Sequence, residues 1–130
     1  REKNIVIYIC DAHREDDLEF KMFPKHCIEG TKGAEIIEEL KPKSEDIVLK
    51  KTRYSGFYGT NLSEILAENK VSEVELVGVC TSICVMDTAG ELRNRDYKVI
   101  VYKDGVADFD LEAHNFALKR MEKIYGCIIK

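Results

Sequence analysis

Cys84 is the residue whose type and surroundings most directly suggest catalysis. The apolar run Val74–Val79 has strand character and a helical pattern begins soon after it, so Cys84 falls on the turn at the strand's carboxyl end. Backbone N–H groups and the positive end of the following helix favour the nucleophilic thiolate there. The same N–H groups can hold the oxyanion of a tetrahedral intermediate. Placement alone leaves open the alternative that Cys84 is a small buried hydrophobic residue.

Asp11, His13 and His26 form a second group of interest. Asp11 and His13 follow the apolar run Asn4–Cys10, at what we expect to be the carboxyl end of a strand. A carboxylate and an imidazole two residues apart can ligate a metal ion, and His26 can be a third ligand. The alternative is that Asp11 caps a turn and that the histidines are ordinary loop residues. Spacing leaves both interpretations open.

Lys51 follows the apolar run Asp46–Lys50, which is typical of another strand. The segment 52–60 after it is rich in aromatic residues and glycine, as a loop that lines a pocket can be. Lys51 is most simply a surface lysine. A lysine at a strand end that faces Cys84 would instead stabilise a thiolate or transfer a proton.

The elements that would position these residues alternate along the chain. This alternation predicts an α/β fold, a three-layer α/β/α sandwich on a parallel sheet with right-handed crossovers. The carboxyl ends of parallel strands lie on one edge of the sheet, so Cys10–His13, Lys51, Cys84 and Asp104 are expected to converge on one cleft. Segments 14–25 and 103–108 are predicted loops. The predicted strands are Asn4–Cys10, Asp46–Lys50, Val74–Val79, Tyr97–Tyr102 and Tyr125–Ile129, and the predicted helices are Ala34–Leu40, Leu62–Asn69, Val85–Arg95 and Leu111–Lys123.

Size and composition limit the class of protein. We expect residues 1–130 to form a single domain, which is long enough for one hydrophobic core. A net charge of -4 without a basic stripe argues against nucleic acid or an anionic membrane as a partner. The apolar runs are far shorter than the ~20 residues that cross a bilayer, and no signal peptide is recognised. Five irregularly spaced cysteines indicate a reducing, cytoplasmic setting.

Three blocks of sequence resemble the isochorismatase-like cysteine hydrolases, the family that includes nicotinamidases. The blocks occur in the family's order, and the resemblance runs over nearly the whole chain. They are Asp11–His13 with Pro24–Ala34, then Lys51–Phe57, then Gly78–Val85.

The resemblance implies a triad of cysteine, lysine and aspartate. Cys84 matches the nucleophile and Lys51 matches the lysine. The Val79–Cys80 peptide matches a cis non-proline bond of the family, which would let the N–H of Cys80 join that of Cys84 in the oxyanion hole. The family's catalytic aspartate ends a strand that precedes the run at Asn4–Cys10, so we expect this chain to be N-terminally incomplete, without that first strand.

The resemblance also implies a divalent metal, zinc or similar, and no organic cofactor. Asp11, His13 and His26 match the metal ligands of nicotinamidases. A further histidine that many nicotinamidases carry has no counterpart here, where Arg14–Glu19 offers only carboxylates. The carboxylates of that segment are Glu15, Asp16, Asp17 and Glu19, and none of them matches the missing histidine.

The activity implied is hydrolysis of the C–N bond of a small amide through a thioester, with nicotinamide converted to nicotinate and ammonia as the first candidate. Tyr54 or Phe57 would line the pocket for the substrate ring. Family members commonly form homo-oligomers, which we also expect here. Alternatives are another small amide, isochorismate, or a non-catalytic α/β domain that retains the scaffold and binds a partner.

Overall fold

The computed structural model describes residues 4–130. Residues 1–3 and the strand expected ahead of them lie outside the described part of the chain. The described residues divide into two compact units. Unit 1 comprises residues 4–53 and 58–60, and unit 2 comprises residues 54–57 and 61–130.

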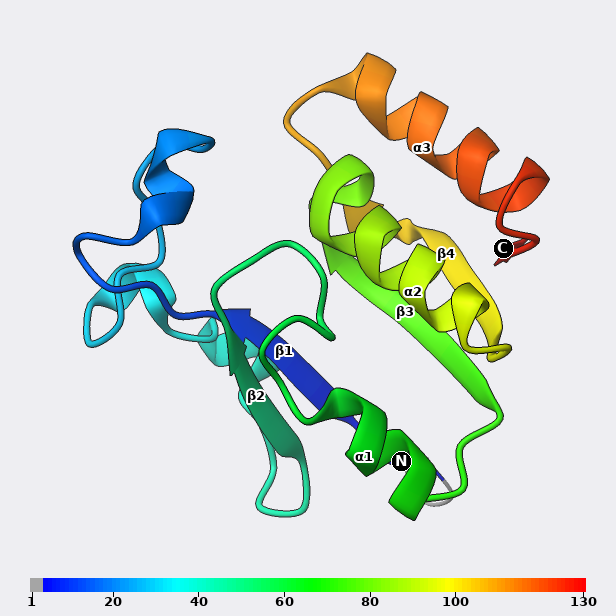
Figure 1. Ribbon diagram of the computed structural model, residues 1–130, viewed down its shortest axis with the longest axis horizontal. Coiled ribbons are helices and arrows are strands. Elements are labelled where there is room, and N and C mark those ends of the chain that lie inside the picture. Colours follow the sequence, from blue (N-terminus) through cyan, green and yellow to red (C-terminus); the bar gives the residue numbers. More distant parts are fainter. Residues whose placement is uncertain (1–3) are drawn as a thin grey trace. The chain divides into compact units, whose positions relative to one another are not determined.

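Unit 1 is built on two parallel strands, β1 (Ile7–Asp11) and β2 (Ile47–Lys51), which lie side by side in Figure 1. Their register pairs Ile7 with Ile47 at one end and Asp11 with Lys51 at the other. Both predicted strands are therefore present, and each ends one residue later than expected. The register places the two charged residues opposite each other at the carboxyl ends of the strands.

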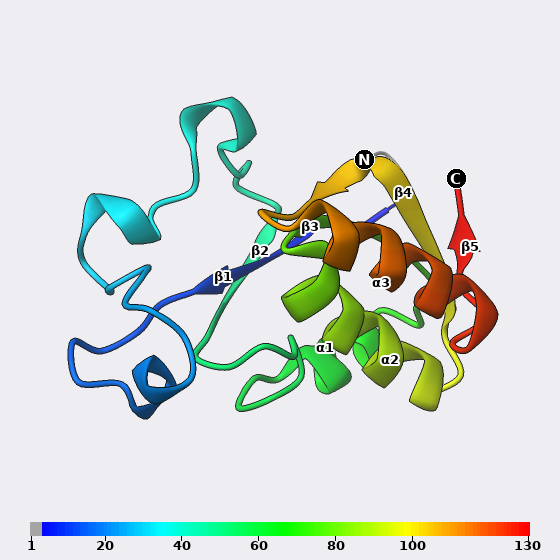
Figure 2. The ribbon, with the colours of Figure 1, turned by 90° about the horizontal axis from the view of Figure 1, so that it is seen from above.

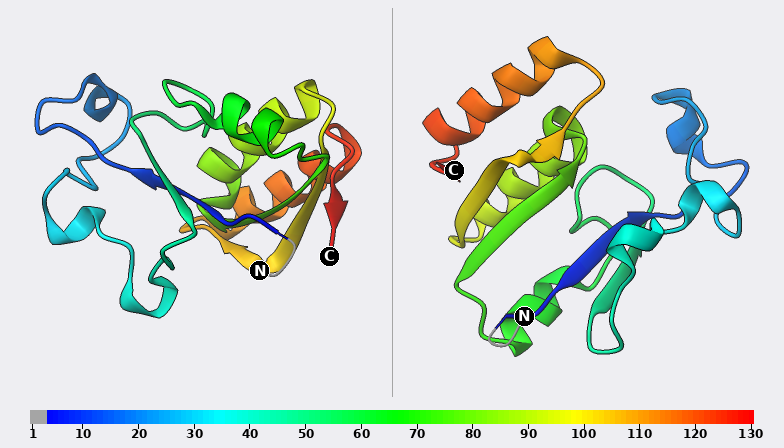
Figure 3. Two further views of the ribbon diagram at one scale, coloured as in Figure 1. Left: turned by 90° about the horizontal axis from the view of Figure 1, so that it is seen from below. Right: turned by 180° about the vertical axis from the view of Figure 1, so that it is seen from behind.

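The connection between β1 and β2 differs from the prediction. The expected helix Ala34–Leu40 is absent from the structure, which has two 3₁₀ turns, Lys32–Ala34 and Glu38–Leu40, separated by extended backbone. Figure 3 shows this connection as an irregular chain with short helical turns. Ile37 and Leu40 are 59% and 58% exposed, so the helical spacing of apolar residues has no surface to pack against. The predicted loop 14–25 also contains a 3₁₀ turn, Leu18–Lys21.

Unit 2 contains a three-stranded parallel sheet in the order β3 (Glu73–Val79), β4 (Lys98–Ala107) and β5 (Ile128–Ile129). The described strands form two hydrogen-bonded groups, β1 with β2 in unit 1 and β3, β4 and β5 in unit 2, and every pairing is parallel, as predicted. Alternating elements give the order of strands along the chain, but they do not show which strands share hydrogen bonds.

The fourth strand continues beyond its predicted end. Residues 103–107 look like a turn in the sequence, but β4 runs to Ala107 and pairs there with Val79. A register shift between Leu76 and Gly78 accommodates the extra length. Asp104 therefore lies within a strand and is exposed, so its predicted place at a strand's carboxyl end is wrong.

Three helices complete unit 2: α1 (Leu62–Glu68), α2 (Met86–Asn94) and α3 (Leu111–Lys123). α2 packs against β4, α3 packs against α2 and β5, and Figure 2 shows α2 and α3 side by side. The described core of this unit has fully buried side chains from α2, β4 and α3. These include Leu92, Val99, Val101, Ala117 and Met121. Within residues 4–130, no helix is both long and apolar enough for a membrane span.

Candidate active site

The three residues predicted to bind a metal ion come together in unit 1. One ligand atom from each of Asp11, His13 and His26 lies within 4.8 Å of the others. The Nε2 atom of His26 is 3.1 Å from Oδ2 of Asp11, and Nε2 of His13 is 3.7 Å from the same oxygen. Backbone bonds from His13 N to Cys27 O, and from Glu29 N to His13 O, hold the two segments together.

Hydrogen bonds orient both imidazole rings of this cluster. Nδ1 of His13 lies 2.9 Å from the carboxylate of Asp17, and Nδ1 of His26 lies 2.8 Å from the carbonyl oxygen of Pro24. Carbonyl and carboxylate oxygens accept hydrogen bonds, so each Nδ1 carries the proton and donates. In a neutral His13 ring this leaves a lone pair on Nε2 that is directed into the cluster, whereas Nε2 of His26 is within hydrogen-bond distance of Oδ2 of Asp11.

Asp17 is held in its charged form. The backbone N–H of Glu19, followed by His13 and the Arg53 guanidinium, holds the pKa of the Asp17 carboxyl well below its usual range. The Glu19 N–H donates to Oδ1 over 2.9 Å, and Arg53 Nη1 donates to the same oxygen over 2.8 Å. Asp17 therefore remains an acceptor that keeps the proton of His13 on Nδ1.

Glu19 is the site residue that sequence reasoning did not identify. Its side chain is 1% exposed, and Oε2 lies 3.2 Å from Nε2 of His13 and 3.7 Å from Nε2 of His26. Only its presence among the carboxylates of the segment Arg14–Glu19 pointed to it. Burial within the 3₁₀ turn Leu18–Lys21 distinguishes Glu19 from the exposed Glu15 and Asp16.

The cluster has unsatisfied buried atoms that fit a metal ion. In the part of the chain that the structure describes, His13 Nε2 and Glu19 Oε2 are the buried side-chain N or O atoms without a hydrogen-bond partner. With the His13 proton on Nδ1, two lone pairs face each other, and a cation between them would remove the repulsion. Two imidazoles and two carboxylates are a donor set that zinc and similar divalent ions accept.

Two phenylalanine rings pack against the imidazoles. The centroid of Phe20 is 5.1 Å from that of His13, and the centroid of Phe23 is 4.9 Å from that of His26. Apolar rings around a metal site limit the access of water and strengthen the electrostatic interactions inside it. The cluster therefore has a partly apolar cover as well as donor atoms.

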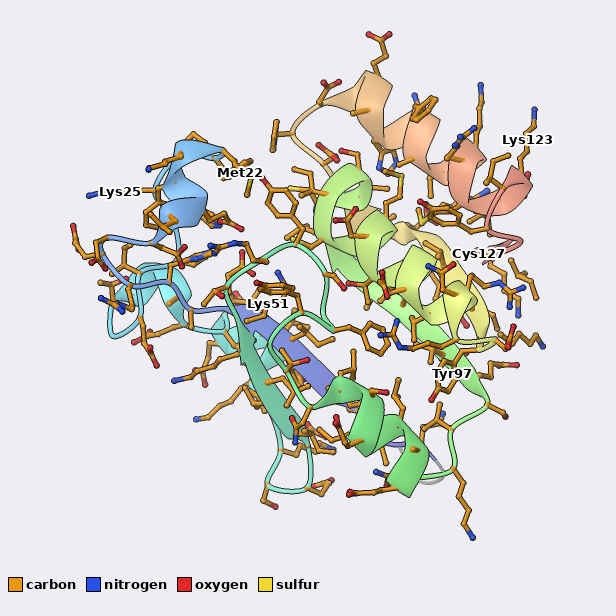
Figure 4. All side chains as sticks on the ribbon, viewed as in Figure 1. Met22, Lys25, Lys51, Tyr97, Lys123 and Cys127 are labelled. Carbon is orange, nitrogen blue, oxygen red and sulfur yellow. The ribbon has the colours of Figure 1, made fainter. Side chains whose placement is uncertain are left out.

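Lys51 is buried, so its interpretation as a surface lysine is wrong. The residue is 5% exposed, and its Nζ atom donates to Oδ1 of Asp11 and, over 2.7 Å, to the carbonyl oxygen of Arg53. Figure 4 shows Lys51 at the carboxyl end of β2. The carboxylate of Asp11 thus binds the ammonium through one oxygen and faces the imidazoles with the other.

In unit 2, Cys84 lies on a π-helical turn, Thr81–Val85, between β3 and α2; we call this the Cys84 turn. The carbonyl oxygen of Cys80 accepts hydrogen bonds from the N–H groups of Ile83 and Val85, over 3.1 and 3.2 Å. The Val79–Cys80 peptide is cis, as the resemblance implies. Cys84 is partly exposed at the carboxyl end of β3, so a fully buried position does not describe it.

The residues expected to line a substrate pocket, Tyr54 and Phe57, belong to unit 2 and are half-buried. The guanidinium of Arg95 lies 4.1 Å from the centroid of the Phe57 ring and covers one face of it. The N–H of Gly56 donates to Oγ1 of the buried Thr88 over 3.0 Å, which fixes this segment to α2. A role for either ring in substrate binding stays a prediction.

Three other cysteines are poor nucleophiles at neutral pH. Burial raises the pKa of Cys10, Cys27 and Cys127, and the negative charge of Asp11 adds to the effect at the first two. A raised pKa keeps the thiol protonated, and the thiol reacts far more slowly than the thiolate. Cys127 follows α3 and is buried (Figure 4).

Comparison with known proteins places these features in context. The family model for the Isochorismatase domain matches residues 1–130. The chain is 38% identical to an uncharacterized isochorismatase family protein, PncA, of Bacillus subtilis, over 93% of this chain and 72% of the relative.

Two solved structures have closely similar folds. Nicotinamidase PncA from Bacillus subtilis superposes with a TM-score of 0.89 at 34% identity, covering 97% of this chain and 74% of that one. Pyrazinamidase of Pyrococcus horikoshii, solved in complex with zinc, superposes with a TM-score of 0.92 at 29% identity, covering 99% and 76%.

Proposed function

The chain belongs to the isochorismatase family of hydrolases, and we propose that it hydrolyses the C–N bond of a small amide with Cys84 as nucleophile. The fold is the α/β fold of isochorismatase-like hydrolases. The observation that carries the proposal is the position of Cys84, a partly exposed thiol on the turn between β3 and α2. Nicotinamide is the first candidate substrate, and the solved Bacillus subtilis nicotinamidase supports that choice.

The proposed reaction proceeds through a thioester. The positive end of α2 favours the thiolate of Cys84, which attacks the amide carbonyl carbon. The N–H groups of Cys80 and Cys84 hold the oxygen of the tetrahedral intermediate. The proton removed from the thiol passes to the leaving nitrogen, so collapse of that intermediate releases ammonia and leaves the acyl group on sulfur; water then cleaves the thioester, which releases the carboxylic acid and restores the thiol.

Lys51 is proposed to stabilise the negative charge of the thiolate, and the aspartate that the family resemblance implies is proposed to accept the thiol proton. Lys51 lies in unit 1 and Cys84 in unit 2, so this pairing rests on the family resemblance. The burial of Lys51 supports a role inside a site, because a buried ammonium is retained only where anions or carbonyl oxygens bind it.

A divalent metal is proposed at Asp11, His13, Glu19 and His26. Bound there, it would supply a Lewis-acidic centre able to ligate the ring nitrogen of a pyridine amide. Within the chain, Asp17 accepts the Nδ1 proton of His13 and so leaves its Nε2 lone pair for a cation, and the carbonyl oxygen of Pro24 orients the His26 ring. Tyr54 and Phe57 are proposed to lie against the substrate ring.

Thiol labelling tests the nucleophile. The protein is treated with iodoacetamide at pH 7, the labelled cysteines are mapped by mass spectrometry, and ammonia release from nicotinamide is measured. We expect Cys84 to be labelled first and Cys84→Ala to abolish hydrolysis, while the matched variant Cys127→Ala retains it. Cys84→Ala with full activity would refute the mechanism. Slow labelling of Cys84 together with no turnover of small amides would favour a non-catalytic binding domain.

Zinc titration tests the metal centre separately. Competition against a chromophoric chelator gives the dissociation constant without reference to activity. Glu19→Gln should weaken binding at least about tenfold, because it removes a charged ligand from the set. Glu15→Gln is the matched control, since that side chain is 78% exposed. Equal dissociation constants for the two variants would remove Glu19 from the proposed ligands.

A further inference from the structure

We propose that Asp108 is a positioning residue for the nucleophile, one that holds the Cys84 turn in place through Ser82. This inference rests on the proposed function, in which Cys84 attacks the substrate. Asp108 acts through its neighbour and makes no contact with the reacting atoms in this proposal.

The carboxylate of Asp108 binds the start of the Cys84 turn through a single oxygen. Oδ2 accepts a hydrogen bond from the backbone N–H of Ser82 over 2.9 Å and another from its hydroxyl over 2.6 Å. Ser82 is two residues before Cys84 in the turn. The two hydrogen bonds therefore fix the position of the backbone at the start of the turn that carries the sulfur of Cys84.

Asp108 is itself fixed by the elements on both sides of it. It follows Ala107, the last residue of β4, which pairs with Val79 of β3 just ahead of the Cys84 turn. Its other oxygen, Oδ1, accepts from the N–H of Asp110 over 3.1 Å, and Asp110 caps the N-terminus of α3 by accepting from Ala113 N. The Asp108 carboxylate, which accepts from Ser82, is therefore held in place by β4 on one side and by the start of α3 on the other.

A second polar contact holds the preceding residue of the turn. The Oγ1 atom of Thr81 is 2.7 Å from Nδ1 of His114, which lies on α3. Thr81 is completely buried. Two consecutive residues at the start of the Cys84 turn are thus tied to the segment that follows β4, one through a carboxylate and one through an imidazole.

The carboxylate of Asp108 is charged at neutral pH, so it can accept both bonds. Burial pushes the pKa of Asp108 upward, but hydrogen bonds from Ser82 and from the N–H groups of Asp110 and Phe109 outweigh it, and the pKa lies below its usual value. Charge-assisted hydrogen bonds of this kind are stronger than neutral ones. Catalytic groups need such support, because a displacement of about 1 Å can cost roughly 10²-fold in rate.

Two substitutions at Asp108 separate the hydrogen bonds from the charge. Asp108→Asn removes the charge and keeps an oxygen that can accept from Ser82, whereas Asp108→Ala removes both. Both variants are uncharged at this position, so the difference between them reports on the oxygen that accepts from Ser82 and not on the charge. Asp104→Ala is the matched control, since Asp104 is exposed on β4. Thermal unfolding verifies that each variant is folded at the assay temperature.

The readouts are the pH midpoint of iodoacetamide labelling at Cys84, and kcat and KM for nicotinamide. We expect Asp108→Ala to lower kcat by about 10²-fold with little change in KM, and to raise the labelling midpoint above that of Asp108→Asn. Asp108→Asn should stay within several-fold of the wild-type kcat. If Asp108→Ala unfolds, Ser82→Ala takes its place and should move both readouts in the same direction.

Equal labelling midpoints and equal kcat values for the alanine and asparagine variants would overturn the inference while leaving the proposed function intact. Wild-type activity in Asp108→Ala would overturn it as well. A wild-type protein whose Cys84 reacts no faster than Cys127 would instead overturn the proposed function, and the positioning role with it.

Discussion

Nδ1 of His13 lies 2.9 Å from Oδ2 of Asp17, four residues further along the chain. Arg53 donates to Oδ1, the other oxygen of the Asp17 carboxylate. This series keeps the proton of His13 on the nitrogen that points away from the metal-ligand cluster. The position of the proton, more than the presence of a histidine, makes Nε2 available to a cation.

The first prediction concerns Asp17. Asp17→Asn should weaken zinc binding by about 10- to 100-fold, the range typical for loss of an outer-shell partner of a ligand histidine. Competition with a chromophoric chelator measures the change. Asp16→Asn is the control, because Asp16 is 73% exposed and among the described contacts pairs only with Arg14, which is 80% exposed. Equal affinities for the two variants would contradict the outer-shell role.

The second prediction concerns the other thiols. Because burial raises the pKa of Cys10, Cys27 and Cys127, their labelling by iodoacetamide should accelerate strongly when the pH is raised from 7 toward their pKa values. Labelling of Cys84 should change much less over the same interval. Quenched time courses analysed by mass spectrometry give all the rates from one sample. Parallel pH profiles for Cys84 and Cys127 would argue against an activated thiol.

The third prediction concerns the core of unit 2. Leu92 on α2 is 1% exposed, so Leu92→Ala should lower the free energy of unfolding by about 2–5 kcal/mol, since it removes buried methyl groups and leaves a cavity. Leu111→Ala makes the same chemical change on α3 at a residue that is 72% exposed. It should change the free energy of unfolding by no more than about 0.5 kcal/mol. Urea titrations measure both, and a similar loss in the two variants would refute this placement of the core.

The fourth prediction concerns stability in acid. The pKa of Asp108 is lower in the folded protein than its ordinary value of 3.8, so its charged form favours folding. That contribution is complete above the unfolded-state pKa and is lost as the pH falls through the folded-state pKa. The stability difference between wild type and Asp108→Ala should therefore be constant near neutral pH and shrink below pH 3.8. Urea midpoints across this interval test the trend, and Asp104→Ala should show no comparable change.

Much of the fold follows from local sequence pattern. Short apolar runs predict a strand at each of the five positions, although β5 covers only Ile128–Ile129 of the predicted Tyr125–Ile129. The helix α3 has the predicted bounds Leu111–Lys123, and Asp110 caps it. The segment Ala34–Leu40 shows the limit of this reasoning. Helical spacing of apolar residues produces a helix only where another surface covers them, and a single segment does not reveal that surface.

The site was predicted only in part, because residue type and spacing can be read from the sequence but burial cannot. Type and spacing identify Asp11, His13 and His26 as a group, and the structure brings them together. Glu19 could not be separated from Glu15, because the two differ in burial and not in chemistry. Asp108 lies in the predicted loop 103–108, whose composition does not reveal that pairing with β3 extends β4 up to Ala107.

The register of β1 and β2 makes the position of Lys51 sensitive to chain length. Successive side chains of a strand point to opposite faces, so deleting one residue from the first part of β2 would bring Thr52 opposite Asp11 and turn the ammonium away. A hydroxyl would then replace a cation beside the carboxylate. We therefore expect insertions and deletions among relatives to fall in the irregular connection at 12–46, and the spacing inside the paired strands to be preserved.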